Sequence, residues 1–252
     1  MTDRASLAAT LTDALQLTQP PVAITFTDRI PDGVRTWDGQ VPAGCRFWQE
    51  AARSTFATTS EHHGLCTLGT YTHNLEVDGA HESERAEALK VFAHLGYVRE
   101  ADIPLIPVVR ERWPYVVYGP LASIPVAPDV VLLFVRSDQS LVLSEASQQM
   151  EGGLPPAMGR PACAIVPQAM NTGRTALSLG CCGARAYLDV LTPDVALYAV
   201  PGARVSAFTE RVAALARANS ILTAFHTQRR RDVESGRRPT IKESLAAMQA
   251  GG

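Results

Sequence analysis

Two stretches of this sequence repeat one order of features, and this order constrains the fold more than any other pattern. Each stretch predicts a strand, a loop, a cysteine that opens a helix, a second strand, a second cysteine that opens another helix, and a closing strand that ends at a proline. The opening strands are residues 22–26 and the continuous apolar run 130–135. Helices are predicted at 46–52, directly after Gly44-Cys45, at 80–95, with acidic residues towards its start, at 141–150 and from 184 onwards. The proline-interrupted segment 103–109 is expected to be a loop. Strands that alternate with helices in this way predict an α/β fold.

The cysteines keep similar spacings in the two stretches. Cys45 and Cys66 are 66 − 45 = 21 residues apart, whereas Cys163 precedes Cys181 by 181 − 163 = 18 residues and Cys182 by 182 − 163 = 19. The features recur after roughly 80 to 115 residues, a period too long for a solenoid. We therefore predict an internal duplication: two similar α/β halves packed about a pseudo-twofold axis, with extra N- and C-terminal helices. Chance similarity is the alternative, because strand-turn-helix units are common.

The predicted boundaries follow from this repeat and from the overall composition. The chain has 252 residues, of which 46% are hydrophobic, so it is long enough for one large domain or two fused small ones. We expect both halves to form one compact unit. The predicted ranges are 1–127 for the N-terminal α/β half, 128–210 for the C-terminal α/β half and 211–252 for a C-terminal helical extension.

Charge and hydropathy exclude several classes of partner. No apolar run approaches the roughly 20 residues of a membrane span, and residues 1–19 lack the basic start and apolar centre of a signal peptide. A net charge of −2 gives no general attraction to nucleic acid or to membranes. The basic run 229–231 lies beside Asp232 and Glu234, which favours a solvated helix face over an anion site. We expect a cytoplasmic protein.

Five cysteines in a reducing compartment are poor candidates for disulfides, so metal binding or nucleophilic chemistry must be weighed. Two cysteines from each half would converge at the seam between the halves. Four thiolates suit an iron-sulfur cluster or a structural zinc. Zinc sites usually take ligands from C-x2-C pairs, which this chain lacks, and the adjacent Cys181 and Cys182 are too cramped to share one ion. Dispersed single cysteines therefore favour a cluster.

Alternatives remain for several of these residues. Cys163 lies among small apolar residues and could be a core cysteine. One cysteine could be a nucleophile with His62 or His63 as its base, although three thiols would then be unexplained. Either histidine could instead contact the cluster or substrate, or be solvated. Arg185 is expected to point from the first turn of a helix towards the same pocket and clamp an anionic substrate, unless it is a surface arginine.

The motifs around these cysteines resemble those of an uncharacterised prokaryotic family, domain of unknown function 169, over roughly residues 15–205. Two departures are the extra segment at His62 and His63, and Gly180 in place of a proline. The resemblance implies a four-cysteine site but no settled reaction. The matching elements are Pro20-Pro21-Val22-Ala23, Gly44-Cys45, Thr58-Thr59-Ser60-Glu61 before Cys66, Ala162-Cys163, and Leu179-Gly180-Cys181-Cys182-Gly183-Ala184-Arg185.

The choice between the adjacent cysteines depends on which pattern is followed. The Leu-x-Cys-x-Gly-x-Arg motif of the family indicates Cys181 as the ligand. A tyrosine follows both Cys66 and Cys182 by five residues, and this offset favours Cys182. We give the motif more weight because it involves three residues.

These observations lead to one prediction for the cofactor and several for the function. We predict a 4Fe-4S cluster held by Cys45, Cys66, Cys163 and Cys181, with Cys182 as the alternate to Cys181 and zinc as the alternative metal. A redox or lyase-type enzyme acting on a small molecule, by desulfuration or dehalogenation, would use Arg185, His62 and His63 as candidate catalytic residues and an electron donor protein as a further partner. The rival hypothesis is a non-enzymatic iron-sulfur redox sensor or electron carrier. The protein could also form a homo-oligomer.

Overall fold

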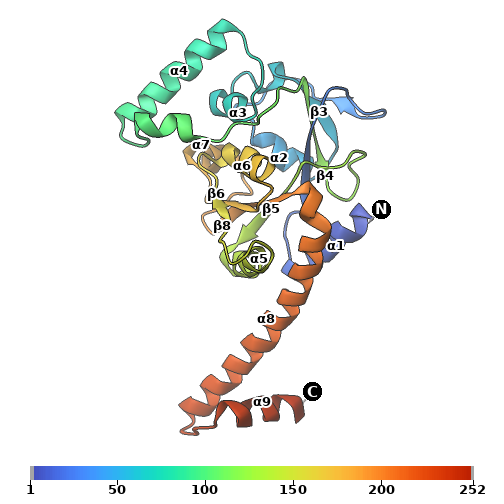
Figure 1. Ribbon diagram of the computed structural model, residues 1–252, viewed down its shortest axis with the longest axis vertical. Helices are drawn as coiled ribbons and strands as arrows, with labels where there is room; N and C mark the ends of the chain where they lie inside the picture. The colour runs from blue at the N-terminus through green and yellow to red at the C-terminus, as the bar shows by residue number, and fades with distance from the viewer. Residues whose placement is uncertain (1–2, 251–252) are drawn as a thin grey trace.

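A single mixed sheet runs through the protein and carries helices on both of its faces (Figure 1). The computed structural model describes residues 3–250. Within that range the strand order is β2-β3-β4-β1-β5-β8-β7-β6. The predicted α/β class is therefore confirmed. The strands are β1 Val22–Thr27, β2 Arg35–Thr36, β3 Phe56–Thr58, β4 Tyr115–Pro120, β5 Val130–Arg136, β6 Ala157–Met158, β7 Ala176–Ser178 and β8 Val195–Pro201.

The centre of the sheet is the antiparallel pair β1 and β5, in which Val22 lies opposite Leu132. β2 pairs with β3 in parallel, and β6 pairs with β7 in parallel. The other neighbouring strands are antiparallel. From one edge to the centre the order is β2, β3, β4, β1, and from the other edge it is β6, β7, β8, β5. In each case the second, third and fourth strands of that half of the chain lie outside its first strand. Residues before and after position 127 therefore contribute to the sheet in the same way.

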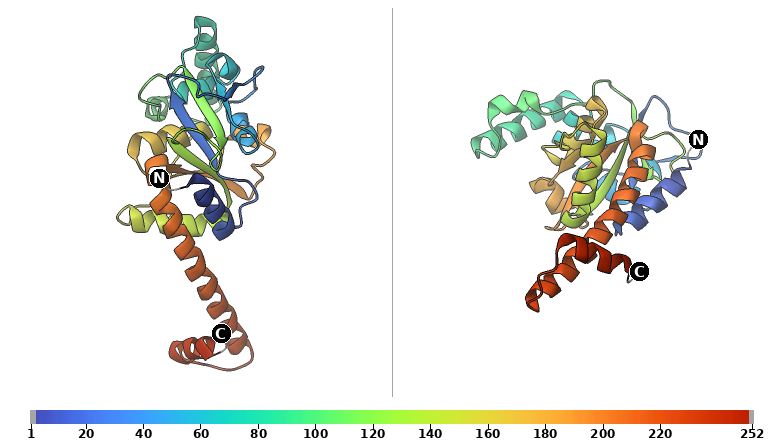
Figure 2. Two further views of the ribbon diagram at one scale, coloured as in Figure 1. Left: turned by 90° about the vertical axis from the view of Figure 1, so that its right-hand side faces the viewer. Right: turned by 60° about the horizontal axis from the view of Figure 1, so that its bottom comes forward.

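Helices cover the two faces of the sheet in separate layers (Figure 2). α2, α6 and α7 pack on one face, which we call the cysteine face because Cys45 and Cys163 lie in its core. α1, α5 and the start of α8 pack on the opposite face. The helices are α1 Arg4–Leu15, α2 Arg46–Ala51, α3 Thr67–Thr72, α4 Gly79–His94, α5 Ser137–Met150, α6 Ile165–Thr172, α7 Cys182–Tyr187, α8 Val205–Glu234 and α9 Ile241–Ala250, with 3-10 turns at Glu61–His63, Glu100–Leu105, Ala162–Ala164 and Gly202–Arg204.

The apolar run that predicted β5 is buried on both sides. Val130, Leu132 and Phe134 face the cysteine side, whereas Val131, Leu133 and Val135 face the opposite helices. Successive side chains of a strand point to opposite faces, so a strand between two helical layers must be apolar at every position. This double burial explains why the run has no polar alternation.

Several element boundaries differ from the sequence-based expectation. α5 begins at Ser137 rather than 141, because the Gln139 side chain accepts a hydrogen bond from the Arg136 backbone N–H and caps the helix. α7 begins at Cys182 rather than 184, with Cys181 as its extended N-cap residue. The 3-10 turn ending at Leu105 occupies part of the expected loop 103–109.

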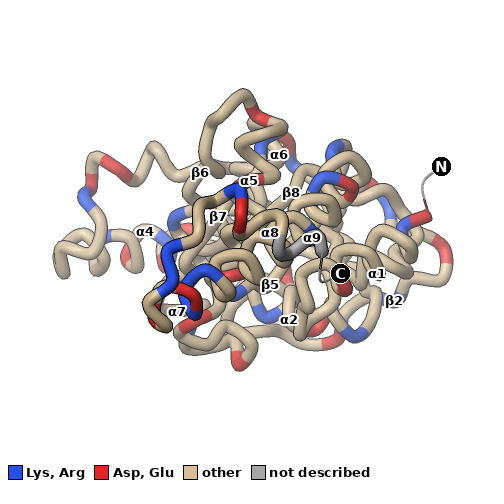
Figure 3. The backbone as a smooth tube through the Cα atoms, turned by 90° about the horizontal axis from the view of Figure 1, so that it is seen from below, with Lys and Arg blue, Asp and Glu red and all other residues tan. Residues whose placement is uncertain are grey.

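Two helical segments extend from the sheet body. α4 has no buried residue, and α8 continues well past the sheet before the chain turns at its far end into α9 (Figure 1). Over the described residues, no helix combines the length and apolarity needed to cross a bilayer. Basic and acidic residues are interspersed along the backbone in the view from below (Figure 3).

Candidate functional site

Four short helices present cysteines from their N-terminal ends on the cysteine face. Cys45 is the N-cap residue of α2, Cys66 of α3 and Cys181 of α7. Cys163 lies in the 3-10 turn that leads into α6. All five cysteines are free and line one cavity of about 320 Å³, with Cys182 the most exposed of them. Cysteines separated by up to 137 residues, 182 − 45, thus bring their thiols to one place.

The thiols are close enough to influence one another's ionisation. Burial, together with the neighbouring thiolates of Cys66 and Cys181, raises the pKa of Cys45 to about 12. Burial, followed by the charge of Cys66, raises the pKa of Cys163 well above its usual value. Burial also raises the pKa of Cys66, against backbone hydrogen bonds from Gly44 and Gly69 that lower it. Ionising these thiols together therefore requires a compensating cation, whose binding releases protons.

Two glycines make room for Cys66. A Cβ atom on Gly69 would lie 2.6 Å from the Cys66 Sγ, well inside van der Waals contact. A Cβ atom on Gly44 would lie 3.7 Å from that sulfur and 2.8 Å from His63 Nδ1. The backbone of the α2 and α3 N-termini therefore approaches the thiol as closely as glycine permits.

Neither predicted catalytic histidine lines the cavity. His62 Nδ1 accepts a 2.9 Å hydrogen bond from the Thr59 backbone N–H, which closes the local turn. His63 is fully buried with its Nε2 atom 3.1 Å from the Thr58 hydroxyl, and burial lowers its pKa well below the usual value. A neutral, enclosed imidazole behind the cysteines packs against Phe47 rather than facing a substrate.

Arg185 is turned away from the pocket that the sequence suggested for it. Its guanidinium donates hydrogen bonds to backbone carbonyl groups, including 2.7 Å to Thr192. It is absent from the residues that line the cavity. Carbonyl groups on both sides of α7 accept hydrogen bonds from the guanidinium and hold it there, which a local motif does not reveal. The acceptors are the carbonyl oxygens of Leu179, Leu191, Thr192 and Val195.

Part of the cavity lining comes from residues that sequence patterns did not single out. α4 and the segment after it contribute Leu89, Phe92, Tyr97, Val98 and Ile106. Arg160 is the charged residue of the lining, within the described part of the chain, and its guanidinium lies 3.5 Å from the Asp102 carboxylate. The acidic pattern of α4 predicted a helix but gave no sign that its apolar residues would cover the thiols.

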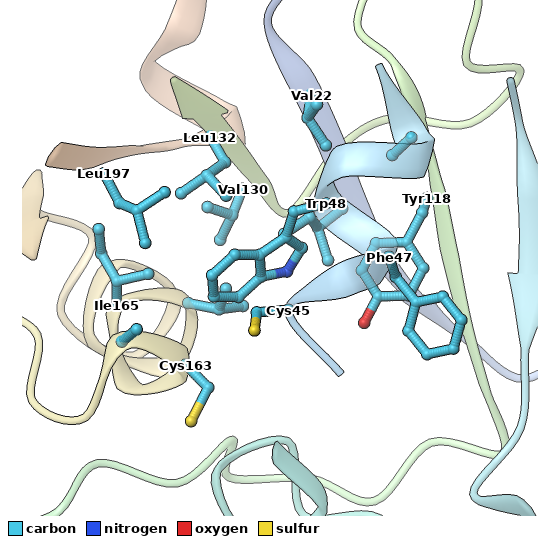
Figure 4. Packing of buried hydrophobic residues seen from close by; sticks show 14 of the residues in the cluster. Val22, Cys45, Phe47, Trp48, Tyr118, Val130, Leu132, Cys163, Ile165 and Leu197 are labelled. Atoms are coloured by element: carbon cyan, nitrogen blue, oxygen red, sulfur yellow. The ribbon is translucent and has the colours of Figure 1, made fainter. Parts of the chain in front are cut away.

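Buried polar atoms without partners gather behind the cysteines. Trp48 Nε1, His63 Nδ1 and the Tyr118 hydroxyl make no hydrogen bond within the described residues. Figure 4 shows Cys45, Cys163, Trp48 and Tyr118 around the same part of the core. Burying a polar group without a partner costs free energy, so an additional acceptor at this place would be stabilising. The cysteine thiols and these unpartnered polar atoms together fit a sulfur-rich group bound by the thiols.

Among the side chains that the structure describes, no group of three or more His, Cys, Asp or Glu is arranged to hold one metal ion.

The family model for domain of unknown function 169, described as an uncharacterised ArCR family, matches residues 10–211. The chain belongs to this family. The DUF169 match includes all eight strands and all five cysteines, and it ends within α8. Comparison with curated proteins and with solved structures found no match.

Proposed function

We propose that this DUF169 protein binds a 4Fe-4S cluster through Cys45, Cys66, Cys163 and Cys181. The observation that carries the proposal is that free thiols from four separate helix starts line one cavity. Iron-sulfur clusters are held by cysteine thiolates and accept ligands from distant segments. Structural zinc is the alternative metal, and the lack of C-x2-C pairs in the chain favours the cluster.

The N-cap geometry favours Cys181 over Cys182 as the fourth ligand. Cys181 stands immediately before α7 as Cys66 stands immediately before α3, and its sulfur accepts a 3.4 Å hydrogen bond from the Ala184 N–H. Cys182 is the first residue of its helix and is exposed. The tyrosine offset pointed to Cys182 because a tyrosine follows Cys66 by five residues, whereas Tyr187 follows Cys181 by 187 − 181 = 6 residues. If Cys181 is the ligand, the second half has one additional residue between the cysteine and the tyrosine.

The internal duplication is part of the same proposal. The strand orders 2-3-4-1 and 6-7-8-5 meet at the antiparallel pair β1 and β5, as expected for two units related by a pseudo-twofold axis. Each unit supplies one cysteine before its first helix on the cysteine face and one as the N-cap residue of its second. Such an axis would bring two ligands from each half to one cluster.

The cavity beside the thiols supports an enzyme that acts on a small molecule by redox or lyase chemistry. The proposed enzyme works in the cytoplasm. Its volume of about 320 Å³ and largely apolar lining are typical of a small-molecule site. A bound cluster supplies electrons or, with an open iron, a Lewis acid. Reductive dehalogenation, R–X + 2 e⁻ + H⁺ → R–H + X⁻, would take both electrons from a donor protein, and desulfuration is the parallel possibility. A redox sensor or carrier without turnover is the competing function.

Purification without oxygen tests the cofactor. We expect a brown protein with broad absorption near 400 nm and about four iron and four sulfide per chain. A colourless protein with one zinc would support the structural metal, and a metal-free protein alkylated rapidly at one cysteine would support a nucleophile. Cys181→Ser should lose iron and Cys182→Ser should retain it. Loss of iron only in Cys182→Ser would contradict the assignment.

A further inference from the structure

Tyr118 is a buried tyrosine whose hydroxyl has no partner. It lies on β4, is fully buried, and belongs to the core of the cysteine face. Its hydroxyl makes no hydrogen bond to any residue that the structure describes. A buried hydroxyl normally finds a partner, because removing it from water without one is costly.

Another buried tyrosine of the same sheet shows how this cost is usually avoided. Tyr198 on β8 faces the opposite helical layer. Its hydroxyl contacts the Ser147 hydroxyl and donates a 3.0 Å hydrogen bond to the Leu143 carbonyl. The two tyrosines share burial and strand context, so the unpartnered state of Tyr118 is a property of its surroundings on the cysteine face.

The surroundings of Tyr118 hold its hydroxyl towards the thiols. The ring stacks on Phe47 with centroids 5.5 Å apart and contacts Phe56 at 5.7 Å, which restricts its orientation. Figure 4 shows the hydroxyl and the sulfur atoms of Cys45 and Cys163 facing the same open side of the core. A tyrosine hydroxyl, with an ordinary pKa of about 10, is protonated at neutral pH and remains a donor.

We infer that the Tyr118 hydroxyl donates a hydrogen bond to a sulfur atom of the cysteine-bound cluster, either a thiolate or an inorganic sulfide. This inference rests on the proposed cluster. Among the described residues, no acceptor forms a hydrogen bond with the Tyr118 hydroxyl. The negatively charged sulfur atoms of a bound cluster would supply one. Hydrogen bonds to these sulfurs withdraw electron density from the cluster and are among the factors that set its reduction potential. Tyr118 thus stabilises the reduced state.

The test compares Tyr118→Phe with Tyr198→Phe in the full chain purified without oxygen. We expect both variants to keep the iron and sulfide content of the wild type. The midpoint potential, measured by redox titration followed by electron paramagnetic resonance, should shift to more negative values in Tyr118→Phe only. Site-specific 3-fluorotyrosine at position 118, a stronger donor, should shift it in the opposite direction. Unchanged potentials in both position-118 variants, with the cluster intact, would overturn the inference while leaving the proposed function standing.

Metal-free protein gives an independent readout if Tyr118→Phe fails to assemble a cluster. Removing an unpartnered hydroxyl should raise the melting temperature of the metal-free protein, whereas Tyr198→Phe should lower it by breaking existing hydrogen bonds. A lower melting temperature for Tyr118→Phe would mean that the hydroxyl already has a partner in the chain, and would overturn the inference. Wild-type protein that binds no iron would overturn both this inference and the proposed function.

Discussion

Gly69→Ala should detach Cys66 from the metal site while leaving the fold intact. The added Cβ would lie 2.6 Å from the Cys66 Sγ, whereas ordinary contact begins at 3.4 Å, so the sulfur must move by at least 3.4 − 2.6 = 0.8 Å. Metal-ligand distances tolerate only about 0.2 Å. The displacement is therefore about four times larger than a ligand bond accepts, and we expect the iron content to fall below half of the wild-type value.

The cost in stability should be much smaller than the loss of iron. The nearest atom is the end of a short side chain, which can rotate away, so overpacking costs at most about 1–2 kcal/mol. Alanine within α3 returns up to about 1 kcal/mol through its higher helix propensity. The free energy of unfolding of the metal-free protein should therefore change by no more than about 2 kcal/mol, as measured by urea denaturation.

Gly79→Ala is the matched control. Gly79 is the first residue of α4, and a Cβ atom there meets nothing within 4 Å. We expect unchanged iron and sulfide content and a stability equal to the wild type or up to about 1 kcal/mol higher. Iron and sulfide measured after anaerobic purification decide the outcome. A Gly69→Ala protein with four iron per chain would show that Cys66 does not need its present position, and the reasoning would fail.

Other changes probe the packing around the site. Arg185→Met should lower the free energy of unfolding by about 2 kcal/mol, because the backbone carbonyls of residues 179–195 lose a charged donor, and an unchanged urea midpoint would contradict this. Glu151→Leu should lower the free energy of unfolding by about 3 kcal/mol, because the buried Glu151 carboxylate pairs with two arginines. Glu87 is exposed, so Glu87→Ala should lower the free energy of unfolding by less than about 1 kcal/mol in the same assay. Burial lowers the pKa of His73 from 6.5 to about 4, so its contribution to metal-free stability is complete above pH 6.5 and is lost, by about 3 kcal/mol, as the pH falls to 4. His73→Gln should flatten this part of the stability profile, and an identical slope would refute the assignment.

The secondary structure was largely predictable because its signals are local. A continuous apolar run of strand length indicated β5, and the glycine before Cys45 with the helix-favouring run after it indicated α2. The boundaries missed at α5 and α7 depend on capping by Gln139 and Cys181, which involve side-chain orientations that propensity does not encode.

The site was only partly predictable, for a similar reason. Cysteine spacing drew attention to the thiols, because cysteine is rare and its position along the chain is informative. Arg185 illustrates the limit: its place in the first turn of a helix suggested an anion clamp, but backbone carbonyl groups before and after α7 bind its guanidinium. Tyr118 illustrates the converse, since nothing in a strand tyrosine reveals that its hydroxyl will be buried beside sulfur.

The sequence by itself determined that strands alternate with helices and which residues carry soft metal-binding chemistry. Only the tertiary structure decided that β1 and β5 pair at the centre of one sheet, that α4 covers the thiols, and which polar atoms lie behind them. Local patterns depend on neighbouring residues, whereas these contacts join segments up to more than a hundred residues apart and follow from packing two apolar faces of one sheet.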